Sequence, residues 1–125
     1  MLKDTRFTFT TDASGDATVY AEKWAGPCRL LSVMYDYGDA ATGADFTFSY
    51  DEYNVVETVL TITNAGVADV VWYPRRIVQD NVGANLTGTA GGDTEPYIIL
   101  GRPKLVVAQG GNVKTGSVIW VVDTL

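Results

Sequence analysis

The sequence has no histidine and only one cysteine, Cys28, among its 125 residues. Without histidine, the chain cannot assemble a Ser-His-Asp triad or a metal site with histidine ligands. A single cysteine cannot form an internal disulfide, which excludes the small disulfide-rich class of secreted domains and is compatible with a reducing cytosol. We expect Cys28 to be a small core residue, because a catalytic thiol would need a base such as histidine.

Long apolar runs and clusters of basic residues are missing too. No apolar run approaches the ~20 residues that a membrane-spanning helix needs, and the first residues, MLKDTRFTFTTD, lack the apolar core of a signal peptide. Residues 1–62 hold ten acids and four bases, and residues 63–125 hold five of each, for a net charge of −6. The sequence therefore predicts no membrane partner and no nucleic-acid partner, since nonspecific nucleic-acid binding depends on clustered Lys and Arg.

Sustained helical periodicity is also absent. Short runs of β-forming residues instead recur every 8–15 residues with turn residues between them, which is typical of an all-β protein. The candidate strands are 6–10, 17–24, 28–37, 45–51, 56–63, 70–74, 96–100, 104–108 and 117–122. We predict one domain over residues 1–125, an antiparallel β-sandwich of about eight strands with a jelly-roll-like arrangement. An immunoglobulin-like sandwich is the alternative, although the paired cysteines of that fold are missing.

Alternation assigns the faces of these strands. In 45–51 the residues expected to face the core are Phe46, Phe48 and Tyr50. In 28–37 the same rule places on one face Leu31, Val33, Tyr35 and Tyr37. Residues 75–95 show no such pattern, and their length, polarity and glycine content predict an irregular segment, which in a compact domain is usually functional or mobile.

The last strand departs from the rule because both of its faces are apolar. Val118, Trp120 and Val122 point one way, and Ile119 and Val121 point the other. A strand of an antiparallel sheet with one solvated face should alternate apolar and polar residues. Two explanations stay open: the second face packs against another copy in a homo-oligomer, or residues 75–95 fold back over it.

Carboxylates gather around one loop, at Asp36, Asp39, Asp45, Asp51 and Glu52. A facing pair could serve a glycosidase, and Asp36, Asp39 and Asp45 could supply oxygen ligands to a calcium ion. The stretch does not match the calcium loop of an EF-hand, and acidic residues in loops mostly face solvent. We therefore expect charged turn residues, and we assign no catalytic residue, no cofactor and no metal ligand.

Aromatic and basic residues meet where the sixth candidate strand ends. Trp72 and Tyr73 directly precede Pro74, and Arg75 and Arg76 directly follow it. Arginine and aromatic side chains are enriched in protein interfaces, so this segment is a candidate contact region; an exposed basic pair at a strand end is the alternative. The three tryptophans and seven tyrosines also leave open a carbohydrate-binding surface, on which aromatic rings stack against sugars.

Four stretches follow one another in order between residue 6 and residue 123: RFTFTTDASGDATVY, TGADFTFS, TVLTITNAGVADVVWYPRRIVQDNVGANL and KLVVAQGGNVKTGSVIWVVD. Together they resemble the cement or decoration proteins of tailed bacteriophage heads, in a pattern of turns and spacings rather than in a catalytic signature. The resemblance implies a non-enzymatic jelly-roll-like domain that binds the outer surface of a phage capsid and stabilises contacts between major capsid subunits.

The resemblance further implies a homotrimer that is located in the virion, has the major capsid protein as its partner, and is assembled in the bacterial cytoplasm. It offers no motif of site residues to transfer, so the candidate contact residues come from this sequence alone. They are Leu2, Arg6, Trp72, Tyr73, Arg75, Arg76, Asn85, Ile119 and Val121. The alternative function is a receptor- or carbohydrate-binding β-sandwich of a phage fibre or tail.

Overall fold

The computed structural model describes residues 1–24, 26–52, 55–86 and 93–125, and within these ranges it contains eleven β-strands and no helix that could cross a membrane. The strands are β1 (Leu2–Thr10), β2 (Ala17–Tyr20), β3 (Cys28–Asp36), β4 (Ala44–Glu52), β5 (Val55–Ala65), β6 (Val70–Trp72), β7 (Arg75–Ile77), β8 (Thr94–Pro96), β9 (Ile98–Ile99), β10 (Arg102–Ala108) and β11 (Thr115–Thr124).

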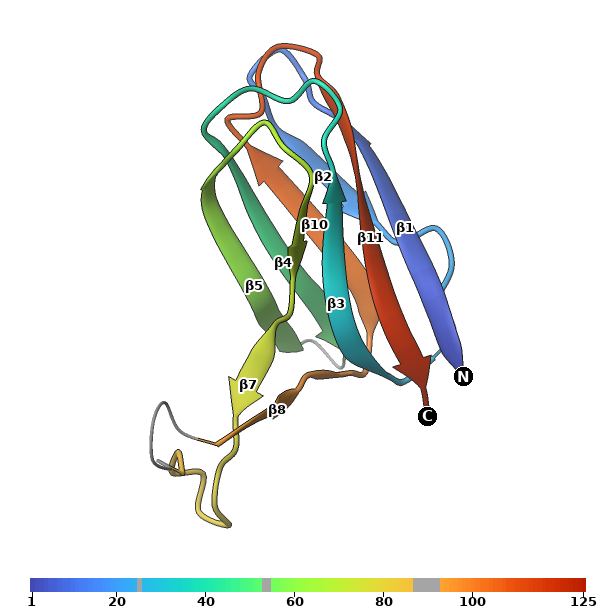
Figure 1. Ribbon diagram of the computed structural model, residues 1–125, viewed down its shortest axis with the longest axis vertical. Coiled ribbons are helices and arrows are strands. Elements are labelled where there is room, and N and C mark those ends of the chain that lie inside the picture. Colours follow the sequence, from blue (N-terminus) through green and yellow to red (C-terminus); the bar gives the residue numbers. More distant parts are fainter. Residues whose placement is uncertain (25, 53–54, 87–92) are drawn as a thin grey trace.

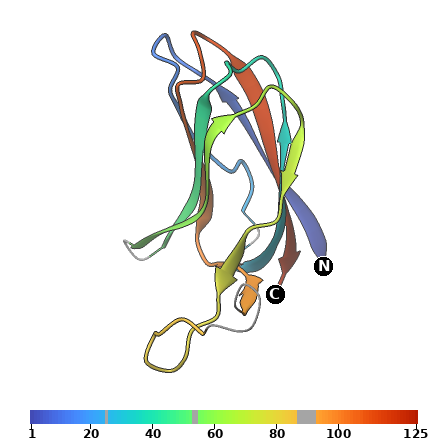
Figure 2. The ribbon, with the colours of Figure 1, turned by 60° about the vertical axis from the view of Figure 1, so that its left-hand side comes forward.

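Most of the strands form two antiparallel sheets that pack face to face (Figures 1 and 2). Sheet A has the order β1-β11-β3-β6, with the short β9 also paired to β3, and sheet B has the order β2-β10-β4-β5. The pairs are nested along the chain: β1 with β11, β2 with β10, β3 with β6, and β4 with β5. Successive pairs alternate between the sheets, which is the arrangement of a jelly roll.

The predicted fold class is confirmed, and the strand order excludes the immunoglobulin-like alternative. An immunoglobulin sandwich keeps its first two strands side by side in one sheet. Here β1 and β2 lie in different sheets, and each pairs with a strand from the end of the chain.

The core lies between the two sheets. Phe7 and Trp120 reach it from sheet A, Phe46 and Phe48 reach it from sheet B, and all four side chains are fully buried. Trp120 links the two sets, because its ring lies 5.6 Å from that of Phe7 and 6.2 Å from that of Phe48, measured between centroids. The predicted inward face of 45–51 is therefore confirmed. Burying a side chain of this size stabilises a fold by about 1.5–3 kcal/mol.

The predicted face of the third strand is wrong in its first half, because β3 contains a β-bulge. Val121 pairs with Ser32 and the next residue, Val122, pairs with Leu30, so Leu31 is an extra residue in β3. An extra residue reverses the alternation at that point. Leu30 consequently lies in the core and Leu31 is only half-buried, whereas Val33 and Tyr35, beyond the bulge, face the core as predicted.

The described part of residues 75–95 does not form the irregular segment that the sequence predicts, and residues 87–92 of that segment lie outside the described residues. β7 and β8 pair with each other in a separate two-stranded sheet, and beyond them Gln79 forms a β-bridge with Asn85. We call residues 75–86 and 93–96 the arm. The arm leaves one end of the sandwich and extends away from both sheets (Figures 1 and 2). Its described residues therefore do not fold back over the outer face of sheet A, which was one of the two explanations for the apolar last strand.

Candidate interaction surfaces

The outer face of sheet A carries apolar side chains where a solvated sheet would carry polar ones. Across the sheet, Ile119 on β11 lies between Arg6 on β1 and Met34 on β3, and Met34 lies opposite Val71 on β6. Met34 and Val71 are 39% and 43% exposed, and Ile119 and Val121 are half-buried. We call Met34, Val71, Ile119 and Val121 the outer patch.

A shallow hollow of about 270 Å³ lies at the outer patch, between residues of β3, β6 and β11. Its lining combines the apolar side chains of Met34, Val71 and Ile119 with the acidic residues Asp36 and Asp69, and no basic residue is among the described residues that line it. Small-molecule pockets are usually about 300–1,000 Å³ and bury most of their ligand. The hollow is smaller, and it suits a side chain of a neighbouring protein surface.

An exposed row of side chains continues from the outer patch into the arm. After Val71, the exposed residues are Tyr73, Arg75 and Ile77. The residues between them, Trp72, Pro74 and Arg76, are half-buried or buried. Tyr73 exposes 66% of its surface and Ile77 exposes 45%. Tyrosine and arginine are the residue types most often found at the energetic centre of protein interfaces, so the row extends the outer patch as a contact surface.

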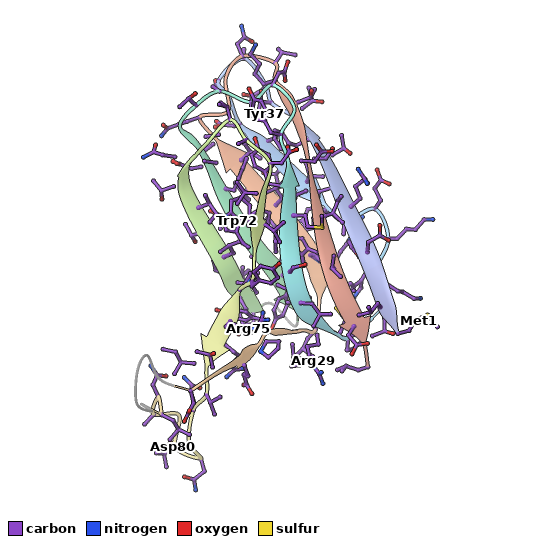
Figure 3. All side chains as sticks on the ribbon, in the orientation of Figure 1. Met1, Arg29, Tyr37, Trp72, Arg75 and Asp80 are labelled. Carbon is purple, nitrogen blue, oxygen red and sulfur yellow. The ribbon has the colours of Figure 1, made fainter. Side chains whose placement is uncertain are left out.

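The two neighbouring arginines have different partners. Nη1 of Arg75 donates hydrogen bonds to the carbonyl oxygens of Pro74, at 2.8 Å, and Leu31, at 3.3 Å, where the sandwich meets the arm (Figure 3). These bonds orient the guanidinium without neutralising it, so its charge is available to a carboxylate. Nε of Arg76 instead lies 3.3 Å from Oε1 of Glu95 on β8. This ion pair is exposed and contributes about 0–1 kcal/mol to the pairing of the arm strands.

Trp72 is half-buried and packs against the core. Its ring stacks on Tyr35, with centroids 6.1 Å apart and planes 12° apart, and lies 6.3 Å from Phe48. Trp120 is fully buried, and Trp24 is half-buried against the core. The tryptophans therefore do not form the exposed stacking surface that the carbohydrate-binding alternative needs.

The tip of the arm is a tight hairpin held by Asp80 (Figure 3). Oδ1 of Asp80 accepts hydrogen bonds from the backbone N–H groups of Val82 and Ala84, both at 2.9 Å, and Gly83 allows the turn through a φ of 83°. Val82 at the apex is 81% exposed and Leu86 is 40% exposed. A two-stranded hairpin has no second layer in which to bury such side chains, so they are available to a partner.

Asn85 and Arg76 line a groove of about 440 Å³ between the arm and β5, together with Arg75 and Glu57. The hydroxyl of Tyr50 donates a hydrogen bond of 3.0 Å to Oε1 of Glu57. Burial, and then this bond, raises the pKa of Tyr50 to about 12. Because charges of both signs line the groove, it has no evident preference for an anion or a cation.

The N-terminal candidates, Leu2 and Arg6, lie within β1 rather than in a flexible extension. Leu2 is 67% exposed at the start of the strand. The N-terminal amine of Met1 lies 2.9 Å from Oδ1 of Asp123 on β11, and this contact lowers the pKa of Asp123. Arg6 and Asp4 are both exposed on the outer face of sheet A, beside Ile119 and Val121 respectively.

Two carboxylates of the predicted acidic loop, Asp39 and Asp45, accept hydrogen bonds from backbone groups. Asp39 accepts hydrogen bonds from the backbone N–H of Thr115, at 2.6 Å, and from its hydroxyl, at 3.3 Å, and the backbone bond lowers the pKa of Asp39. Asp45 accepts one from the N–H of Asn64. Over the part of the chain that the structure describes, no three Asp, Glu, His or Cys residues come together as metal ligands. Burial raises the pKa of Cys28 to about 11, so its thiol is a protonated core group at neutral pH.

No protein-family model, curated protein or solved structure matches this chain. The likeness to phage decoration proteins therefore stays a prediction from the sequence. The structure brings five of the candidate contact residues onto one continuous surface, namely Arg6, Tyr73, Arg75, Ile119 and Val121. Sequence reasoning missed Met34 and Val71, because Met34 joins this surface through the pairing of β3 with β11, and Val71 joins it through the pairing of β3 with β6.

Proposed function

We propose that this chain is a non-enzymatic structural protein that binds the outer surface of a phage capsid through its arm and stabilises contacts between major capsid subunits. The sequence resemblance supports the capsid as the partner. The single observation that supports the arm as the binding element is that it extends beyond the sandwich and exposes Ile77, Val82 and Leu86 (Figure 1).

An arm that exposes apolar side chains and has no core of its own becomes more stable when a partner covers those side chains. Each aliphatic side chain that is fully buried contributes about 1.5–3 kcal/mol, and the loss of translational and rotational freedom on binding offsets much of that gain. A single copy would therefore bind weakly. Many equivalent copies that bind only the assembled shell would add their contributions and shift the equilibrium towards that state by mass action.

The test is binding to purified capsids from which the protein has been omitted. We expect the wild-type protein to co-sediment with them in a simple ratio to the major capsid protein, and to raise the temperature at which the shells break. The double variant Val82→Ser, Leu86→Ser should lose at least about tenfold in affinity while its own unfolding temperature stays the same.

Val113→Ser is the matched control, because Val113 is 61% exposed in the turn between β10 and β11, at the other end of the sandwich from the arm. It should bind as the wild type does. Shells that bind none of the wild-type protein, or that resist heat and low salt equally well without it, would contradict the proposal.

A further inference from the structure

We infer that the outer face of sheet A packs against the same face of a second copy of this chain. The two copies are related by a two-fold axis that lies in the plane of the interface and runs perpendicular to the strands. This contact is independent of capsid binding through the arm. It identifies which of the two explanations for the apolar last strand holds, and it specifies which residues meet.

The outer patch needs a cover that the residues described by the structure do not supply. Ile119, Val121, Met34 and Val71 lie on the face that points away from the core, and the arm leaves the sandwich in another direction (Figure 2). An antiparallel sheet can leave one face in water, and that face is then polar. An apolar outer face therefore indicates a sheet that is covered on both sides.

The charges on this face have a definite arrangement around the outer patch. At one end of the face Asp36 and Asp69 line the hollow, and at the other end Arg75 bonds to the bulge of β3. Along β1, Arg6 lies level with Ile119 and Asp4 lies level with Val121, one row nearer to the Arg75 end. Acid and base are thus separated along the strands on both sides of the face.

A two-fold axis between these two rows makes the face complementary to itself. It keeps each strand over its own counterpart and exchanges the two ends of the strands, so that the same patch is used on both copies, as in any isologous contact. Arg6 then faces Asp4 of the second copy, twice, and Arg75 faces the acidic end with Asp36 and Asp69, also twice. The apolar residues of the two rows meet one another in the centre.

The other face-to-face two-fold axis, parallel to the strands, gives no such match. It keeps each row level and exchanges the sides of the sheet, which places Arg6 over Val71 and Asp4 over Tyr73. Charged groups that lose water without gaining a partner oppose association. The charge pattern therefore selects the axis perpendicular to the strands, and the two arms then extend from opposite ends of the dimer.

The size of the face indicates a weak dimer. β1 and β3 have nine residues each, β11 has ten and β6 has three. At about 4.8 Å between strands and about 3.4 Å per residue, they cover roughly 500 Å² on each copy. Specific interfaces usually bury at least about 1,000 Å² in total, and those near this limit are transient. We therefore expect a dimer whose population depends on protein concentration.

The first experiment is sedimentation of the wild-type protein over a concentration series, with Ile119→Lys as the disrupting variant. The wild type should dimerise, and Ile119→Lys should raise the dimer dissociation constant at least about tenfold, because it places an unpaired charge at the centre of the contact. Val106→Lys is the matched control: Val106 is half-buried on the outer face of sheet B, so its dimer should be unchanged. Thermal unfolding of each variant shows whether it still folds.

The second experiment reverses charges within one chain. Arg6→Asp alone and Asp4→Arg alone should each weaken the dimer, because each places like charges opposite one another. The double variant Arg6→Asp, Asp4→Arg exchanges the two charges and should restore it, because the inferred axis again pairs acid with base.

A wild type that stays monomeric at every concentration would overturn the inference, as would a homotrimer of the kind that the resemblance implies. If Ile119→Lys leaves the dimer intact, the contact lies on another surface. If the double charge variant dimerises as weakly as the single charge variants, the inferred axis is excluded. None of these results bears on whether the arm binds capsids.

Discussion

The two outer faces of the sandwich have opposite character although both belong to antiparallel sheets built around the same core. Read across the strands, one row of sheet B contains Thr18, Val106, Thr47 and Thr61. The corresponding row of sheet A contains Arg6, Ile119, Met34 and Val71. Sheet B follows the rule for an antiparallel sheet with one face in water, and sheet A does not. The outer face of sheet A is therefore more apolar than a face that contacts only water, and it is suited to a protein contact.

Both outer faces depend on the same core, and removing its central residue should have the largest effect. Trp120 is fully buried and touches Phe7 of sheet A and Phe48 of sheet B. Trp120→Ala should lower the free energy of unfolding by about 3–5 kcal/mol, because it leaves a large cavity between the sheets. Urea denaturation followed by circular dichroism measures this loss.

Val106→Ala, on the outer face of sheet B, is the comparison for Trp120→Ala. It shortens a half-buried side chain outside the core and should cost about 1 kcal/mol or less. Equal losses in the two variants would mean that the sheets do not share a core around Trp120.

Alkaline pH should weaken the two sheets together, because each contributes one buried tyrosine. Burial is the main cause that raises the pKa of Tyr35 on β3 and of Tyr50 on β4 to about 12, whereas a tyrosine in an unfolded chain has a pKa of about 10. Between these values the unfolded state has released protons that the folded state still holds. Stability should therefore be constant below about pH 10 and fall as the pH rises towards 12.

The urea midpoint as a function of pH measures this decline, and the absorbance of tyrosinate follows the ionisation itself. Replacing both residues by phenylalanine should flatten the decline. A stability that stays level up to pH 12 in the wild type would show that neither hydroxyl is buried as described.

The same two tyrosines should respond differently to loss of the hydroxyl. Tyr50 donates its hydrogen bond to Glu57, whereas the hydroxyl of Tyr35 is buried and has no hydrogen-bond partner among the residues that the structure describes. Tyr50→Phe should lower the free energy of unfolding by about 1 kcal/mol, and Tyr35→Phe should leave it unchanged or raise it slightly. Urea denaturation at neutral pH compares them, and a larger loss in Tyr35→Phe would mean that its hydroxyl has a partner after all.

Sequence alone was sufficient where a residue's environment depends on its own strand. The alternation in 45–51 correctly placed Phe46 and Phe48 in the core, and the last strand was recognised as apolar on both faces. It was insufficient at Leu31, because a single extra residue in β3 is set by its pairing with β11. Nor could it show the outer patch, since Val71 reaches Met34 only through a contact between distant parts of the chain.

The hairpin at the tip of the arm was missed although the sequence held a signal for it. In DASGD, Oδ1 of Asp12 accepts hydrogen bonds from the N–H groups of Ser14 and Asp16, and Gly15 has a φ of 85°. Asp80 makes the same two bonds in DNVGA. Both turns share the pattern Asp-x-x-Gly, in which the carboxylate organises the turn and glycine accepts the positive φ. The turn at Asp80 lies in 75–95, where the glycine-rich composition made its pattern hard to distinguish from an irregular segment. The turn at Asp12 lies between two candidate strands, 6–10 and 17–24, which makes it easy to identify.

The smallest effect on stability should come from two substitutions at the edges of the outer faces, one that makes an apolar residue of sheet A polar and one that makes a polar residue of sheet B apolar. Val71 on β6 and Thr61 on β5 are exposed residues of edge strands in opposite sheets, and they have nearly the same shape. Val71→Thr and Thr61→Val should each change the free energy of unfolding by less than about 0.5 kcal/mol, as measured by thermal unfolding at low protein concentration. In sedimentation at high concentration, Val71→Thr should weaken self-association and Thr61→Val should not affect it. If Thr61→Val instead strengthened association as much as Val71→Thr weakened it, association would follow the general hydrophobicity of the surface, and the outer patch of sheet A would have no special role in it.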